Sequence, residues 1–156
     1  MKKILALLVL TLVVVTGCKP QAVTADTAKP IEGKVKYEYK ATTRGSGISI
    51  VIDDRLLNVS KRSLGQSPVV NAPSYLTESE WDTLLAETGK IDLEKLETLE
   101  APTKKYMFDG AMAVNFTITV NDKVYNTVTF DHGNPPDEIK PLIEKIIELS
   151  KLEETK

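Results

Sequence analysis

The stretch MAVNFTITV at residues 112–120 decides the fold, because apolar and polar side chains alternate along its whole length. Such alternation, with a period of two residues, predicts a β-strand that buries one of its faces. Asn121-Asp122 follows as a two-residue connection, and KVYNTVTF at residues 123–130 continues the alternation. A connection this short predicts that the second strand returns antiparallel to the first.

The same alternation predicts three further strands earlier in the chain, at residues 34–40, 48–52 and 55–61. Arg44-Gly45-Ser46-Gly47 and Asp53-Asp54 connect these strands as turns. Residues 63–74 hold one glycine and two prolines, and they predict a loop.

Three segments have the spacing of amphipathic helices. Thr77-Glu78-Ser79-Glu80 matches a capping box that opens the first helix, which is expected to stop at Gly89. Asp92 is placed to cap a short second helix, and Pro141 belongs in the first turn of a third, which is expected to start near Ile139. The side chains expected to point inward are Trp81, Leu84 and Leu85, then Leu93, Leu96 and Leu99, and finally Ile139, Leu142, Ile143, Ile146 and Leu149.

The order of elements is therefore β-β-β-α-(α)-β-β-α. We predict an α+β domain with an antiparallel sheet of about five strands and two or three helices packed on one face. This domain covers residues 33–156 and contains no internal repeat.

Composition excludes several classes of protein. The chain has 156 residues, 20 Lys+Arg against 22 Asp+Glu, and a formal net charge of −2. This balance argues against a nucleic-acid-binding protein, which would usually carry a basic face. One His and one Cys exclude a zinc site built mainly from these residues, and they exclude an internal disulfide.

The N-terminus has the pattern of an export signal. Met1-Lys2-Lys3 is a short positive segment, and residues 4–16 form an apolar run that is too short to span a bilayer comfortably. The run ends in Val15-Thr16-Gly17-Cys18, which resembles the lipobox of bacterial lipoproteins. The resemblance implies that Cys18 receives a diacylglycerol and that cleavage after Gly17 frees an α-amino group for further acylation. The alternatives are an ordinary signal peptide followed by a cysteine, and an uncleaved N-terminal anchor.

By this interpretation residues 1–17 are a lipoprotein signal peptide, and residues 18–32 are the lipidated Cys18 and a flexible tether. The tether contains Pro20, Pro30 and mostly small residues. The predicted location is the bacterial cell envelope, with the membrane as a partner through lipidated Cys18. Lys19 stands where some bacteria use an acidic residue to retain lipoproteins in the inner membrane. Its presence favours the outer membrane if the envelope has two.

Several short matches in the C-terminal half carry a family resemblance: DGA at 109–111, FTITV at 116–120, TVTF at 127–130, Gly133, Pro136 and PLI at 141–143. Over residues 77–149 this pattern resembles that of emfourin-like proteins, which are small bacterial inhibitors of thermolysin-type metalloproteases. The resemblance implies their fold and makes a protease a candidate partner. It assigns no inhibitory residue, and both the 63–74 loop and the lipid anchor depart from the family's cytosolic form.

His132 is the most conspicuous candidate for chemistry, because it follows a predicted strand at a position where ligand-binding loops often lie. With Asp53, Asp54, Asp109 and Asp131 it could bind a cation if these side chains converged. The spacing does not require convergence, and the alternative is a turn at Asp131 with an exposed His132.

The remaining motifs are weaker. Ser46 lies between two glycines but in neither a nucleophile elbow nor a phosphate loop, and a hairpin turn explains it. We therefore assign no catalytic residue, no metal ligand and no cofactor, and Cys18 is the one site residue predicted.

Three functions remain open. The first is a membrane-anchored module that binds an envelope protein, possibly a protease, through a sheet edge or the 63–74 loop. The second is a small metal-dependent or hydrolytic enzyme that uses His132. The third is an envelope protein that binds a small ligand in an apolar cleft between sheet and helices. The missing convergence of catalytic groups favours the binding module over an enzyme.

Overall fold

The computed structural model of the chain describes residues 31–152. The predicted signal peptide, Cys18 and most of the predicted tether therefore lie outside the described residues. The strands are β1 (Val35–Thr42), β2 (Gly47–Asp53), β3 (Leu56–Arg62), β4 (Val69–Val70), β5 (Ser74–Tyr75), β6 (Ala113–Val120), β7 (Lys123–Asn126) and β8 (Phe130–Asp131). The helices are α1 (Glu78–Thr88) and α2 (Lys140–Ser150), with 3₁₀ turns η1 (Leu93–Thr98), η2 (Lys105–Phe108) and η3 (Asp137–Ile139).

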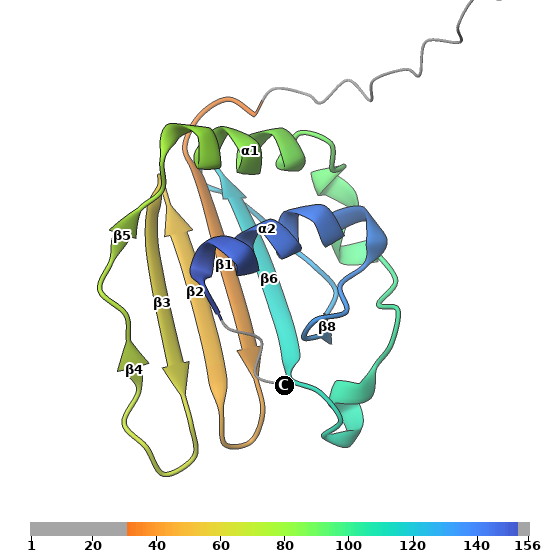
Figure 1. Cartoon of the computed structure of the whole chain (residues 1–156). Coiled ribbons are helices and arrows are strands. Elements are labelled where there is room, and N and C mark those ends of the chain that lie inside the picture. The colour runs from red at the N-terminus through yellow and green to blue at the C-terminus, as the bar shows by residue number, and fades with distance from the viewer. Residues whose placement is uncertain (1–30, 153–156) are drawn as a thin grey trace, which may run out of the picture.

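The strands form one antiparallel sheet in the order β4-β3-β2-β1-β6-β7. β5 also pairs with β3, and β8 also pairs with β6. Figure 1 shows α1 and α2 crossing the same face of this sheet. The predicted α+β class, with an antiparallel sheet covered by helices on one face, is confirmed. Neither helix among residues 31–152 has the length and apolar character that crossing a membrane requires.

The predicted strand number of about five is wrong, because the sheet has eight strands among the described residues. Of the additional strands, β4 lies inside the predicted 63–74 loop and β5 begins at its last residue, Ser74; each is only two residues long, too short to show a period. The strand expected at 123–130 is divided into β7 and β8. Between them the Val128 N–H turns away from β6 and donates to the Leu96 carbonyl at 3.3 Å.

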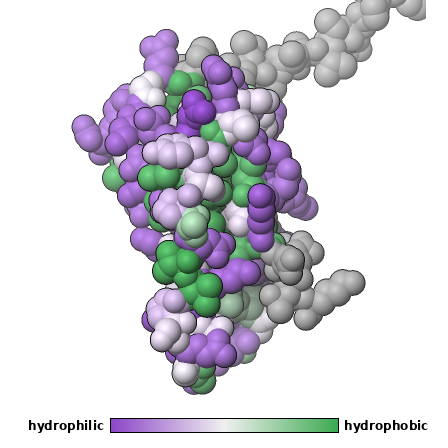
Figure 2. All heavy atoms as spheres, turned by 60° about the vertical axis from the view of Figure 1, so that its left-hand side comes forward, coloured by the Kyte–Doolittle hydropathy of each residue, from purple (hydrophilic) through white to green (hydrophobic). Residues whose placement is uncertain are grey.

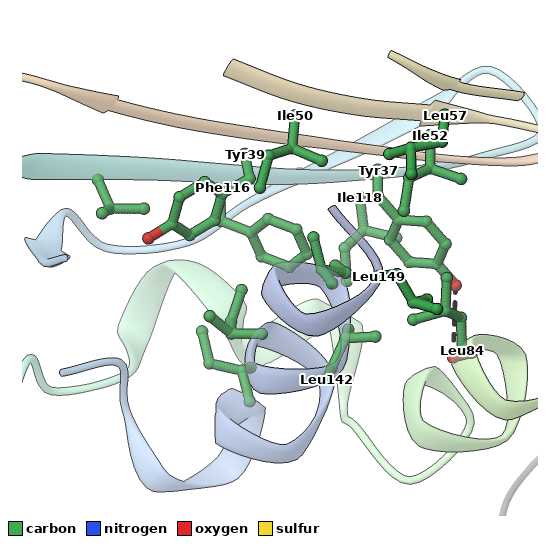
Figure 3. Close-up of a cluster of buried hydrophobic side chains, with 14 of the residues drawn as sticks. Tyr37, Tyr39, Ile50, Ile52, Leu57, Leu84, Phe116, Ile118, Leu142 and Leu149 are labelled. Atoms are coloured by element: carbon green, nitrogen blue, oxygen red, sulfur yellow. Dashed lines mark hydrogen bonds between the residues drawn. The ribbon is translucent and has the colours of Figure 1, made fainter. Parts of the chain in front are cut away.

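The hydrophobic core lies between the sheet and the helices, centred on β1. Tyr37 and Tyr39 on β1 are almost completely buried, as is Phe116 on the neighbouring strand β6 (Figure 3). The Tyr37 and Phe116 rings are parallel, with centroids 6.5 Å apart. Trp81 meets Tyr37 edge-on at 5.9 Å, so the inward position predicted for Trp81 is confirmed.

The helices follow their sequence signals closely. Thr77 caps α1, and the reciprocal hydrogen bonds with Glu80 complete the predicted capping box. α2 begins one residue after Ile139 with Pro141 in its first turn, and all five residues of its predicted apolar stripe are buried. The expected second helix is the 3₁₀ turn η1, where the Asp92 side chain makes no capping hydrogen bond.

The two ends of the strands are distinct, and we name them by where the chain enters. The tether end carries Ile31, which packs against the core, and Asn121, whose side chain donates to the Glu32 carbonyl at 3.2 Å. The distal end is the opposite one, at the bottom of Figure 1. It consists of the β1–β2 connection at residues 43–46, the segment 61–66 and the turn at residues 104–109.

Candidate functional site

Asp131 is a buried structural residue rather than an exposed turn residue. Its side chain is 2 % exposed, and it accepts hydrogen bonds from the backbone N–H groups of Lys105 at 2.9 Å and Tyr106 at 2.7 Å. The Thr103 hydroxyl donates to the same carboxylate. Asp131 thus satisfies two backbone donors in the first turn of η2, as a helix-capping side chain does.

Hydrogen bonds stabilise the ionised form of the buried Asp131 carboxyl. Burial raises the pKa of the Asp131 carboxyl, but the hydrogen bonds from Thr103, Tyr106 and Lys105 outweigh burial and hold this pKa below its usual value. Asp131 is therefore an ionised group with fixed partners, suited to holding η2 in place. It is poorly suited to exchanging a proton with a substrate near neutral pH.

His132 is half-buried and connected to the core. Its Nδ1 lies 2.6 Å from the hydroxyl of Tyr39, and its backbone N–H donates to the Met112 carbonyl at 2.9 Å. Burial raises the pKa of the Tyr39 hydroxyl above its usual value, so Tyr39 stays protonated at neutral pH. His132 does lie in a turn, but the alternative of an exposed His132 is wrong, because its side chain is half-buried and contacts Tyr39.

The four aspartates considered with His132 lie at opposite ends of the sheet. Asp53 pairs with Lys36 near the start of β1, whereas Asp131 pairs with Ala113, whose other neighbour is Thr42 at the end of β1. Six residues of strand separate the two positions, which corresponds to about 20 Å. Within residues 31–152 no three Asp, Glu, His or Cys side chains come close enough to hold a metal ion.

Ser46 occupies the hairpin position predicted for it. Its hydroxyl lies 2.9 Å from that of Thr43, and the Thr43 N–H donates to the Ser46 carbonyl at 2.9 Å. These bonds close the turn between β1 and β2.

A shallow groove lies along α2 rather than between the sheet and the helices. Its volume is about 360 Å³, and it is lined by Gly133, Pro135, Ile143, Glu144, Ile147, Glu148 and Leu152. The interface of the helices with the sheet is instead filled by core side chains (Figure 3).

The sheet has one open edge, formed by β4, β5 and the residues between them. Among the described residues no strand pairs with β4 or β5 on the side away from β3. Val69, Val70 and Tyr75 are exposed here, Val70 to 67 % and Tyr75 to 75 %. Figure 2 turns this edge toward the viewer and shows hydrophobic atoms gathered over β4.

The open edge exposes backbone N–H and C=O groups that point away from the sheet. Asn71 donates inward to the Val59 carbonyl at 2.9 Å, and Leu76 donates inward to the Arg55 carbonyl at 2.9 Å. Because alternate residues of an antiparallel strand point their N–H and C=O groups to opposite sides, those of Val70 and Tyr75 point outward. Pro73 interrupts this row, which limits how long a strand could pair along it.

The opposite edge is covered. η1 lies beside β7, where Lys123 forms an ion pair with Glu94. The Leu96 carbonyl of η1 also accepts the hydrogen bond from Val128. η1 therefore flanks the β7 edge, whereas the β4–β5 edge is paired only on its inner side within the described sheet.

The distal end presents a second group of exposed apolar side chains. Phe108 is 85 % exposed and Met107 63 %, both on η2, and Leu64 is 82 % exposed. Leu64 lies against Gly45, so closely that a Cβ at Gly45 would stand 3.0 Å from the Leu64 Cβ. Arg44 pairs with Asp109 at 3.8 Å, which places η2 beside the same hairpin turn.

Sequence reasoning located the open edge only as a loop and missed the exposed pair Met107-Phe108. KKYMF at residues 104–108 has no helical period, and its turn depends on Asp131, which is more than twenty residues away. No local signal could have found this arrangement.

Comparisons of the chain with protein-family models, with curated proteins and with solved structures find no match. Function is therefore inferred from the chain's own residues.

Proposed function

We propose that this protein is a lipid-anchored envelope lipoprotein that binds another protein through its open edge, residues 69–75. The exposed apolar side chains of an otherwise well-packed domain carry this proposal. Val69, Val70 and Tyr75 lie on an edge whose outward backbone groups are unpaired within the described sheet, while the other edge is covered by η1.

The chemistry of the edge supports a protein partner. Tyr side chains are enriched at protein interfaces because they combine apolar area with a hydrogen-bonding group. The outward N–H and C=O groups of Val70 could pair with a short extended segment, and Pro73 would keep that pairing brief. The resemblance to emfourin-like proteins makes a protease the first partner to try.

The anchor is part of the same proposal. The lipobox at Val15–Cys18 would place Cys18 in the membrane as an acylated cysteine, with the domain on a short tether. Two or more acyl chains give stable membrane residence. The outer membrane is the proposed location in an envelope with two membranes.

A crosslinked pull-down from native envelopes with the lipidated protein tests this function. We expect one stoichiometric partner, identified by mass spectrometry, to be recovered with the wild-type protein and reduced with Cys18→Ala. Val70→Lys should abolish recovery, because it places a charge in the apolar contact.

Val124→Lys is the matched control for this experiment. Val124 is also an exposed valine on a short strand, 55 % exposed, but it lies on β7 at the covered edge. Equal recovery with both lysine variants, or recovery of no specific protein, would contradict the proposal. Failure of the domain to inhibit thermolysin-type enzymes would remove the protease as partner but leave the binding site standing.

A further inference from the structure

Charge is segregated between the two ends of the domain. The distal end carries five basic residues (Arg44, Lys61, Arg62, Lys104 and Lys105) and a single exposed acidic one, Asp109. The tether end and the start of α1 carry no such excess: seven acidic residues there (Glu32, Asp53, Asp54, Glu78, Glu80, Asp82 and Asp122) face six basic ones, which are Lys34, Lys36, Arg55 and Lys123, with Lys145 and Lys151 near Glu80. The basic excess is therefore concentrated at the distal end, although the net charge of the chain is small.

The basic end also carries the exposed apolar side chains described above. Leu64 follows β3 and Phe108 precedes β6, and these strands are three inter-strand spacings apart, or about 14 Å. The two side chains are held by fixed contacts, Leu64 against Gly45 and η2 by the hydrogen bonds to Asp131. The distal end therefore carries both exposed apolar side chains and basic ones.

We propose that the distal end docks on an anionic lipid bilayer. Lys and Arg side chains near such a surface are attracted to its headgroups, and apolar side chains between them bury into the boundary of the acyl chains. A bilayer offers both environments over a wide flat area, which suits apolar groups that adjoin two strands about 14 Å apart. The tether end carries no comparable basic excess, so attraction to the surface favours docking by the distal end.

The chain is long enough for this orientation. Twelve residues, 19–30, lie between Cys18 and the described part of the chain, and fully extended they reach at most about 43 Å. The eight residues of β1 span about 26 Å. A domain anchored at Cys18 can therefore turn its far end toward the membrane, a point that rests on the proposed lipidation. Docking by this end leaves the open edge at the side, accessible to a partner.

The experiment separates docking from the anchor by using a chain that begins at residue 19. Residues 31–152 contain the whole described core, so this chain lacks none of it. Its binding is measured by co-sedimentation with vesicles of phosphatidylcholine containing phosphatidylglycerol, and with vesicles of phosphatidylcholine alone. We expect binding to the anionic vesicles only, with a steep loss as salt is raised from about 0.05 M to about 0.5 M.

Two double variants test the two parts of the surface. Arg62→Glu with Lys104→Glu should lower the partition coefficient at least about tenfold, because two attracted charges become repelled ones. Leu64→Ser with Phe108→Ser should lower it by a similar factor without changing the charge. All four side chains are exposed, so circular dichroism and thermal unfolding should remain as in the wild type.

Lys90→Glu with Lys140→Glu is the matched control, with the same change in net charge at exposed positions away from the distal end. It should retain at least half of the binding. Equal binding to neutral vesicles, equal loss in the control, or no binding to anionic vesicles overturns the proposal. If the distal charge reversal instead removes a crosslinked acidic protein while no variant binds vesicles, the surface binds protein and the lipid proposal is wrong. Val70→Lys tests the open edge separately, so the two proposals can fail independently.

Discussion

The Tyr39 hydroxyl lies 2.6 Å from Nδ1 of His132, and this contact joins the central strand of the sheet to the turn after β8. Tyr39 is fully buried on β1, and His132 follows the Asp131 carboxylate that holds η2. The placement of Met107 and Phe108 at the surface thus depends on a chain of contacts that starts in the core.

Replacing Tyr39 by Phe tests this connection. We expect a loss of about 0.5–1.5 kcal/mol in the free energy of unfolding, because a buried hydrogen bond is removed while the ring is kept. Amide hydrogen exchange at Lys105 and Tyr106 should accelerate, because the turn that carries Asp131 loses its tie to β1. Tyr75→Phe is the control, since Tyr75 is 75 % exposed and should change neither quantity.

Asp131→Asn should destabilise the protein by about 1–3 kcal/mol near pH 7, because a charged acceptor of three hydrogen bonds is replaced by a neutral amide. The Asp131 pKa is lowered on folding, so its stabilising effect is present above the unfolded value of about 3.9 and is lost as pH falls through the folded value. The difference from wild type in urea unfolding should therefore shrink below about pH 4. A difference that stays constant to lower pH would contradict this assignment.

Alkaline pH should destabilise the domain through its buried tyrosines. Burial raises the pKa of Tyr37 to about 12, partly offset by a hydrogen bond with Thr88, whereas an unfolded Tyr titrates near 10. A raised pKa means that the stabilising effect is complete below about pH 10 and is lost as pH rises toward 12. Tyr37→Phe should be less stable at pH 8 but show a shallower decline in melting temperature above pH 10.

Thr77→Ala should cost about 1 kcal/mol, because Thr77 accepts the Glu80 N–H and completes the capping box of α1. Thr83→Ala serves as the comparison at an exposed position of the same helix, where the hydroxyl only donates to the Ser79 carbonyl. Chemical denaturation of both variants measures the difference. Equal midpoints would mean that the cap contributes nothing beyond the loss of a hydroxyl.

The sequence predicted those parts of the fold that depend on local periodicity. The strand with Phe116, the capping box at Thr77 and the apolar stripe of α2 each repeat a pattern over a full element, and the structure confirms them. β4 and β5 could not be predicted, because a two-residue strand shows no period and forms only where β3 offers partners.

The open edge and the distal end could be predicted even less well than β4 and β5, because both surfaces form only when distant segments come together. The 63–74 segment was considered as a binding loop, but its exposed apolar edge emerges only when β4 and β5 pair with β3. Arg44, Arg62 and Lys104 are far apart in the sequence, and their charges accumulate at one end only because antiparallel strands return there. Composition, with its small net charge, conceals this asymmetry.

The position of β1 between β2 and β6 also determines when the protein can fold. Thr42 pairs with Ala113 and Val35 with Val120, separations of 71 and 85 residues. Contacts between such distant residues slow folding, because a long loop must close before they form. Under the proposed export, β1 would emerge early and would wait, with one side unpaired, until residues 113–120 had crossed the membrane. In that case, a chaperone that shields β1 until β6 arrives should raise the yield of folded protein without changing its final stability.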